Sequence, residues 1–186
     1  MIESSGSMIL PRGSLQSKAP LVLEMSRVYE AEGRLQDLAA ILPGTAAEFM
    51  SVMNGAAHLT TNHIAAVTQE VILAKRECDR RKAVVVLEEM PKKFASMKES
   101  GMKPNEDSRE AILALDEQYS NLKDRLDCLM AAGAHLENKV KTFIRAFNAA
   151  KSIMERRSVM AAGPESNFGD TVFEVSLPKA GHYTGE

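Results

Sequence analysis

Residues 112–154 read "ILALDEQYSNLKDRLDCLMAAGAHLENKVKTFIRAFNAAKSIM", and this stretch decides the fold. Apolar side chains recur at two positions of a seven-residue repeat, and only Gly133 interrupts them over about six heptads. Such a seam is typical of coiled coils and long helical bundles. Because a lone helix cannot bury it, we predict that copies of the chain associate through the seam. Its members are Ile112, Leu115, Tyr119, Leu122, Leu126, Leu129, Leu136, Val140, Phe143 and Phe147.

The preceding helical pattern is predicted to pair with this one. Ile64, Val71, Cys78 and Val85 are also spaced by seven residues, although the pattern turns polar near Arg81. A proline at position 91 is expected to kink or end this helix, and the Gly, Pro, Asn and Ser residues that follow indicate a linker. We therefore predict a helical hairpin or coiled-coil domain over residues 62–160.

The two ends of the chain have other patterns. Residues 1–19 are rich in Ser, Gly and Pro and predict a flexible segment, and short helices are expected over 20–61, with a break at the Pro-Gly pair 43–44. Residues 161–186 are expected to be an extended tail, within which 171–177 alternates like a single strand. With 5% aromatic residues and no Trp in 186 residues, the predicted fold class is all-α.

The sequence carries no pattern of catalytic or cofactor chemistry. It has no phosphate-binding Gly loop, no paired-Cys motif and no metal-binding His-Glu helix, so we expect no enzyme activity, no cofactor and no metal site. Cys78 and Cys128 are predicted to remain thiols in a reducing compartment. Neither a signal peptide nor a membrane-spanning run is present, which predicts a soluble, cytoplasmic protein without membrane contact.

Charge is divided into blocks along the chain, although the formal net charge is only -2. Residues 75–103 hold nine bases against five acids, 105–127 three against seven, and 139–157 six against one. An antiparallel hairpin that placed 139–157 beside 62–85 would unite both basic blocks into a surface for phosphate groups. The candidate nucleic-acid-binding residues are Lys75, Arg76, Arg80, Arg81, Lys82, Lys92, Lys93, Lys139, Lys141 and Arg145.

A simpler interpretation of the basic run is a solvated helix face. Glu77 lies one turn from Arg80 and Arg81, and such pairs are ordinary surface salt bridges. Arg76 and Arg80, however, are four residues apart and repel each other mildly, which helix stability alone would not favour. Both interpretations therefore stay open at this point.

Residues 115–147, "LDEQYSNLKDRLDCLMAAGAHLENKVKTFIRAF", resemble the C-terminal helix of the UvsY-like recombination mediators of T-even-type phages. The likeness lies in Gln118-Tyr119, Leu126-Asp127 and Arg145 to Phe147, with Lys75-Arg76 in the preceding helix, and it extends over about residues 62–157.

The resemblance implies a homo-oligomer that binds single-stranded DNA through Lys75 and Arg76. It also implies that the protein helps to load a recombinase onto strands coated by single-stranded-DNA-binding protein, in the host cytoplasm if the gene is phage-encoded. The alternative is a coiled-coil structural or adaptor protein, such as a virion component, without nucleic-acid binding.

Overall fold

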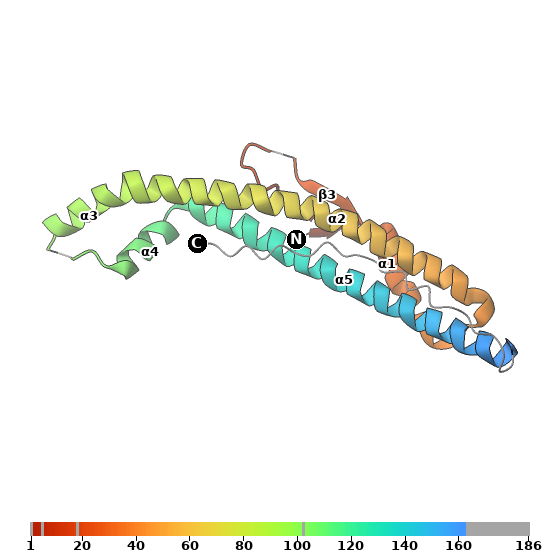
Figure 1. Ribbon diagram of the computed structural model, residues 1–186. Helices are drawn as coiled ribbons and strands as arrows, with labels where there is room; N and C mark the ends of the chain where they lie inside the picture. Colours follow the sequence, from red (N-terminus) through yellow and green to blue (C-terminus); the bar gives the residue numbers. More distant parts are fainter. Residues whose placement is uncertain (1, 5, 18, 102, 163–186) are drawn as a thin grey trace.

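Two long antiparallel helices form the body of the molecule (Figure 1). They are α2 (Pro43–Val84) and α5 (Glu117–Ala162), each about 60–70 Å long at about 1.5 Å of rise per residue. The computed structural model describes residues 2–4, 6–17, 19–101 and 103–162. Long helices dominate this part of the chain, so the predicted all-α fold with a helical hairpin is confirmed.

Beyond α2 the chain forms a tip, residues 85–114, before it turns back into α5. A π-helical turn, η2 (Val85–Glu89), leads into α3 (Met90–Glu99), and α4 (Glu106–Ala114) returns toward α5. At the break predicted near Pro91 the helix therefore changes type, from the α-helix α2 through the π-helical turn η2 to the α-helix α3. Proline has no N–H to donate and its ring crowds the preceding turn, and the wider π turn accommodates both.

Helix α2 begins at Pro43, so the short helices predicted up to residue 61 and the hairpin predicted from residue 62 share one helix, and the boundary predicted at 61/62 falls inside it. Proline is well suited to the first turn of a helix, where its missing N–H has no partner. The Thr60 hydroxyl donates to the Ala56 carbonyl oxygen at 2.7 Å, four residues earlier. Because the threonine is satisfied inside the helix, the polar triplet 60–62 does not end it.

The first residues form a small antiparallel sheet in the order β1-β2-β3. Its strands are β1 (Ile2–Ser4), β2 (Ser7–Leu10) and β3 (Leu21–Glu24). Met8 pairs with Leu23 and Leu10 with Leu21, and all four side chains are buried on one face of the sheet. The prediction of a helix from residue 20 is therefore wrong, because residues 21–24 form a strand. The segment 1–19, predicted to be flexible, contains two short strands, and the alternation of β2 buries a hydrophobic face.

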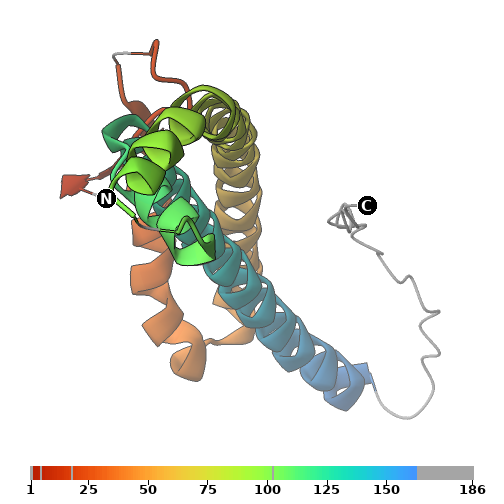
Figure 2. The same ribbon diagram turned by 90° about the vertical axis from the view of Figure 1, so that its left-hand side faces the viewer.

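Helix α1 (Ser26–Arg34) and a 3₁₀ turn, η1 (Leu35–Ala40), connect the sheet to α2. Figures 1 and 2 show α1 beside the hairpin, at the end away from α3 and α4. One core joins the sheet, α1, α2 and α5, while a smaller cluster of Val85, Met90 and Ile112 holds the tip together. The tip is thus packed separately from the main core.

The predicted seam is buried within one chain. Tyr119, Leu126 and Phe147 are half-buried, whereas Leu115 is 79% exposed. Because six members are already buried within one chain, the prediction that the seam joins two copies is not supported for them. These are Ile112, Leu122, Leu129, Leu136, Val140 and Phe143.

Two helices carry the seam, not one. Asp116 separates α4 from α5, and its Oδ1 accepts a hydrogen bond from the Tyr119 backbone N–H at 2.7 Å, which caps α5. Gly133, by contrast, lies inside α5, where an added Cβ would be 3.8 Å from Val67 Cγ1 of α2. An added Cβ would make only an ordinary contact there, so Gly133 interrupts the apolar spacing but neither the helix nor its packing against α2.

Two further predictions concern the cysteines and the tail. Neither Cys78 nor Cys128 takes part in a disulfide bond, as predicted. The strand predicted for 171–177 lies outside the described residues, as does the tail after Ala162. Within the described ranges, no helix combines the length and the apolar character needed to cross a membrane.

Candidate nucleic-acid interface

Arg81, one of the predicted phosphate-binding residues, points into the molecule. Its Nε donates to Asp116 Oδ1 at 2.9 Å, and its Nη2 contacts both Asp116 Oδ2 and Glu89 Oε1. The hydrogen bond to Asp116 is the main reason why the pKa of Arg81 is raised. Arg81 therefore joins α2, η2 and the start of α5, and the prediction that it contacts nucleic acid is wrong.

The ion pair between Arg81 and Asp116 makes the stability of the tip depend on pH. Hydrogen bonding to Arg81 is the main cause that lowers the pKa of Asp116 below its ordinary value of 3.8. A carboxylate with a lowered folded pKa stabilises the fold above its ordinary value, and this contribution is lost as the pH falls through the folded value. We expect protection from amide hydrogen exchange, corrected for the intrinsic rate at each pH, to fall more in residues 106–119 than in residues 129–143 between about pH 6 and about pH 3.

An Asp116→Asn variant is the control for this pH dependence, because it cannot titrate at this position. Its protection in residues 106–119, corrected for the intrinsic exchange rate, should already be low at about pH 6 and should change less with pH. Equal pH dependence in the variant and the parent would show that Asp116 does not control the tip.

Lys139 is also engaged inside the molecule. It is 9% exposed, forms an ion pair with Glu32 of α1, and its Nζ lies 5.3 Å from the centre of the Tyr29 ring. A lysine that is surrounded by a carboxylate and a ring fastens α1 to α5. The prediction that Lys139 binds nucleic acid is therefore wrong.

The other eight candidate residues have exposed side chains. Within the described ranges, Arg80 alone among them forms an ion pair, a weak one with Glu77 at 3.6 Å. An ion pair of this length on an exposed helix face leaves the guanidinium accessible. The eight are Lys75, Arg76, Arg80, Lys82, Lys92, Lys93, Lys141 and Arg145.

The hairpin does not bring the two basic blocks together. Val67 approaches Gly133 and Arg81 binds Asp116, so residues 62–85 lie along about residues 116–138 of α5. The basic block of 75–103 therefore meets the acidic block of 105–127, and 139–157 lies toward α1. The predicted pairing of 139–157 with 62–85 is wrong, because the chain reverses near Gly101 (φ 77°) and this reversal fixes the register.

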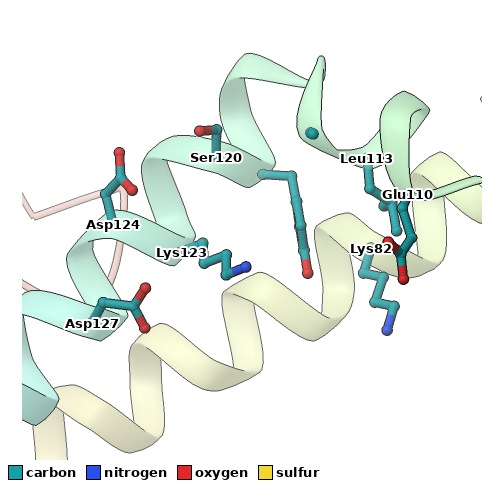
Figure 3. Close-up of a pocket in the computed structure, with 9 residues that line it drawn as sticks. Lys82, Glu110, Leu113, Ser120, Lys123, Asp124 and Asp127 are labelled. Carbon is teal, nitrogen blue, oxygen red and sulfur yellow. The ribbon is translucent and has the colours of Figure 1, made fainter. Parts of the chain in front are cut away.

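A polar cleft of about 670 Å³ opens where α2, α4 and α5 meet. Lys82 comes from α2, and Lys123 extends from α5 toward α2, whereas Asp124 points away from it (Figure 3). Two lysines face three carboxylates around this cleft, which gives the lining a slight excess of negative charge. Its full lining is Lys82, Glu110, Leu113, Ala114, Tyr119, Ser120, Lys123, Asp124 and Asp127.

A second, more apolar hollow of about 330 Å³ adjoins the first. Lys82 and Leu113 line both hollows. Phe94 of α3 contributes an aromatic ring and Arg109 of α4 a second cation; Val86, Met90 and Pro91 complete the lining. The tip therefore presents two neighbouring hollows on the side of α2 that carries Lys82.

The sequence predictions missed three residues of these hollows: Tyr119, Lys123 and Arg109. Tyr119 was assigned only to the seam, yet it also faces the cleft. Its spacing of four residues from Lys123 is a signal that places both side chains on one face of a helix. Arg109 gave no such signal, because its position depends on how α4 folds back.

Comparison with protein-family models, with curated proteins and with solved structures finds no match for this chain. The part of the chain that the structure describes also contains no group of three or more His, Cys, Asp and Glu residues placed to hold a metal ion.

Proposed function

We propose that this protein binds single-stranded DNA through cations on α2 and α3 and assists the loading of a recombinase. The observation that carries the proposal is the set of exposed basic side chains between residues 75 and 93. Lys75, Arg76, Lys82, Lys92 and Lys93 form no ion pair within the described ranges, although acidic residues are plentiful nearby. Cations left without protein partners are suited to phosphate groups.

The likeness of residues 62–157 to the UvsY-like mediators supports the same proposal. It supplies the recombinase and the single-stranded-DNA-binding protein as expected partners, and Lys75-Arg76 as the expected DNA contact. Both residues are exposed on α2, where a DNA strand has access to them.

Self-association belongs to the proposal, but through a different surface from the predicted seam. Four exposed aliphatic residues lie on α2 and η2 as two separate pairs, Ile72-Leu73 and Val86-Leu87, which together we call the outer stripe. Leu87 is 75% exposed, and exposed apolar residues grouped on one helix favour contact with another protein surface. We expect copies of the chain to meet through this outer stripe.

The outer stripe also favours the alternative function, a structural or adaptor protein without nucleic-acid binding. In that case the stripe binds another protein, and the exposed cations only keep the helix solvated. The two functions differ in one measurement, which is the retention of a labelled single strand by the purified protein at moderate salt.

The first test of the proposal is the salt dependence of binding. Replacing both Arg76 and Arg80 with Ala removes up to two phosphate contacts, and each contact contributes about 0.7 to the slope of log affinity against log salt. We therefore expect the slope to decrease by about 0.7 to 1.4, with helix content unchanged because alanine is the better helix former. Fluorescence anisotropy over a salt series measures the slope.

A matched control for this test is the pair Lys151→Ala and Arg156→Ala. It removes the same charge from exposed positions on α5, but far along the hairpin from residues 75–93. This control should keep the parent's slope. A slope that is equal in all three proteins would mean that the basic run is only a solvated face.

A further inference from the structure

The two hollows at the tip have the parts of a base-stacking site. One contains the half-buried ring of Tyr119 and the other the half-buried ring of Phe94, and Lys82 lies on the border between them. Lys123 and Arg109 add one further cation to each hollow. Proteins that follow a single strand combine rings that stack on bases with cations that contact phosphates.

The charges around the polar cleft determine where a nucleotide places its base and where it places its phosphate. Three carboxylates line the polar cleft, so a phosphate group is repelled from its interior and stays at the rim, near exposed Lys82. The carboxylates accept hydrogen bonds from exocyclic amino groups, which cytosine, adenine and guanine carry and thymine lacks. The interior of the cleft therefore suits an amino-bearing base, with its phosphate outside.

We propose that the tip holds two adjacent nucleobase subsites, one at Tyr119 and one at Phe94, with the connecting phosphate on Lys82. The inference rests on the proposed binding of single-stranded DNA and adds where the bases lie. A duplex is excluded from this site because its base faces are stacked and closed. The Tyr119 subsite selects an amino-bearing base (cytosine, adenine or guanine) over thymine, since Glu110 and Asp127 accept from exocyclic amino groups.

The experiment compares two strands of about ten nucleotides, one of deoxycytidine and one of abasic sugar-phosphate units of the same length. The full chain is titrated against each strand by fluorescence anisotropy. Tyr119→Leu and Phe94→Leu should each weaken binding to the deoxycytidine strand about tenfold, because stacking on one ring is lost. Neither change should alter binding to the abasic strand, which has no base to stack.

Two further variants keep the test decisive. Phe147→Leu makes the same chemical change at a half-buried ring far along α5 and should bind both strands like the parent. Tyr119→Phe keeps the ring, so it should retain the stacking affinity even if Tyr119→Leu disturbs the fold. A thymidine strand should bind about tenfold more weakly than the deoxycytidine strand.

Each outcome decides a different claim. If the parent binds deoxycytidine and abasic strands equally, and the leucine variants do as well, the subsites are overturned while phosphate binding stands. If the parent binds neither strand, the proposed function fails and the subsites fail with it. Equal affinity for thymidine and deoxycytidine would overturn the selection of an amino-bearing base.

Discussion

Replacing Leu129 with Asp is expected to unfold the hairpin. Leu129 is fully buried in the main core, together with Val67 of α2 and Leu136 of α5. Loss of a buried leucine costs about 2–5 kcal/mol, and a carboxylate without a partner in its place adds several more. The sum is more than about 5 kcal/mol, a large part of the stability of an ordinary domain. Helix content and its thermal transition, followed by circular dichroism, measure the effect.

Leu115→Asp is the matched control, because Leu115 belongs to the same predicted seam but is 79% exposed. It should change stability by no more than about 0.5 kcal/mol. The pair also separates two roles of the seam. If Leu129→Asp kept its helix content and only the sedimenting mass decreased, the seam would be an interface between copies and not the core of one chain.

The heptad pattern predicted the long helix α5, because this spacing places apolar residues on one helix face. The spacing is the same whether that face packs within one chain or between two copies. It could not show which helix covers that face. Leu129 and Leu136 have the spacing of an interface seam, but they are buried in one core with residues of α2 and the sheet of the same chain. The interruption at Asp116 was also hidden, because an N-cap is a local hydrogen bond and not a change in apolar spacing.

The N-terminal sheet was missed for a different reason. Leu21, Val28 and Leu35 happen to be seven residues apart, and this spacing concealed the shorter alternation of Leu21 and Leu23. Strands of three or four residues give little periodic signal. Their burial depends on the distant α2 and α5, which a local pattern does not contain.

The candidate site was predicted in part. Helical spacing alone could not show that Arg81 points inward while Arg80 points outward, since this depends on where α5 lies. Lys139 was misassigned for the same reason, because its partners Glu32 and Tyr29 are more than a hundred residues away. The tertiary fold therefore determines which cations remain available for a ligand.

Gly13→Ala is expected to detach the N-terminal segment from α2. An added Cβ would lie 2.0 Å from the Glu70 carbonyl oxygen and 2.7 Å from the Ala74 backbone nitrogen, both within a long helix that cannot yield. The loop between β2 and β3, which contains Gly13, must therefore move away from α2. Glu70, which is 8% exposed, then loses the Arg12 guanidinium at 2.6 Å and the Gly13 N–H at 2.7 Å. We expect a loss of about 3 kcal/mol, because a buried carboxylate is left without partners. Chemical denaturation measures it.

Gly55→Ala serves as the matched control for this substitution. Gly55 lies within α2, and an added Cβ would meet nothing within 4 Å. Alanine there should stabilise the protein by up to about 1 kcal/mol, because glycine costs conformational entropy in a helix interior. Replacing glycine with alanine is thus expected to destabilise the protein at position 13 and to stabilise it at position 55. The difference between the two isolates the contact of residues 12–13 with α2. Equal stability of Gly13→Ala and the parent would mean that residues 12–13 do not dock on α2, and that the flexible segment predicted for 1–19 is correct there.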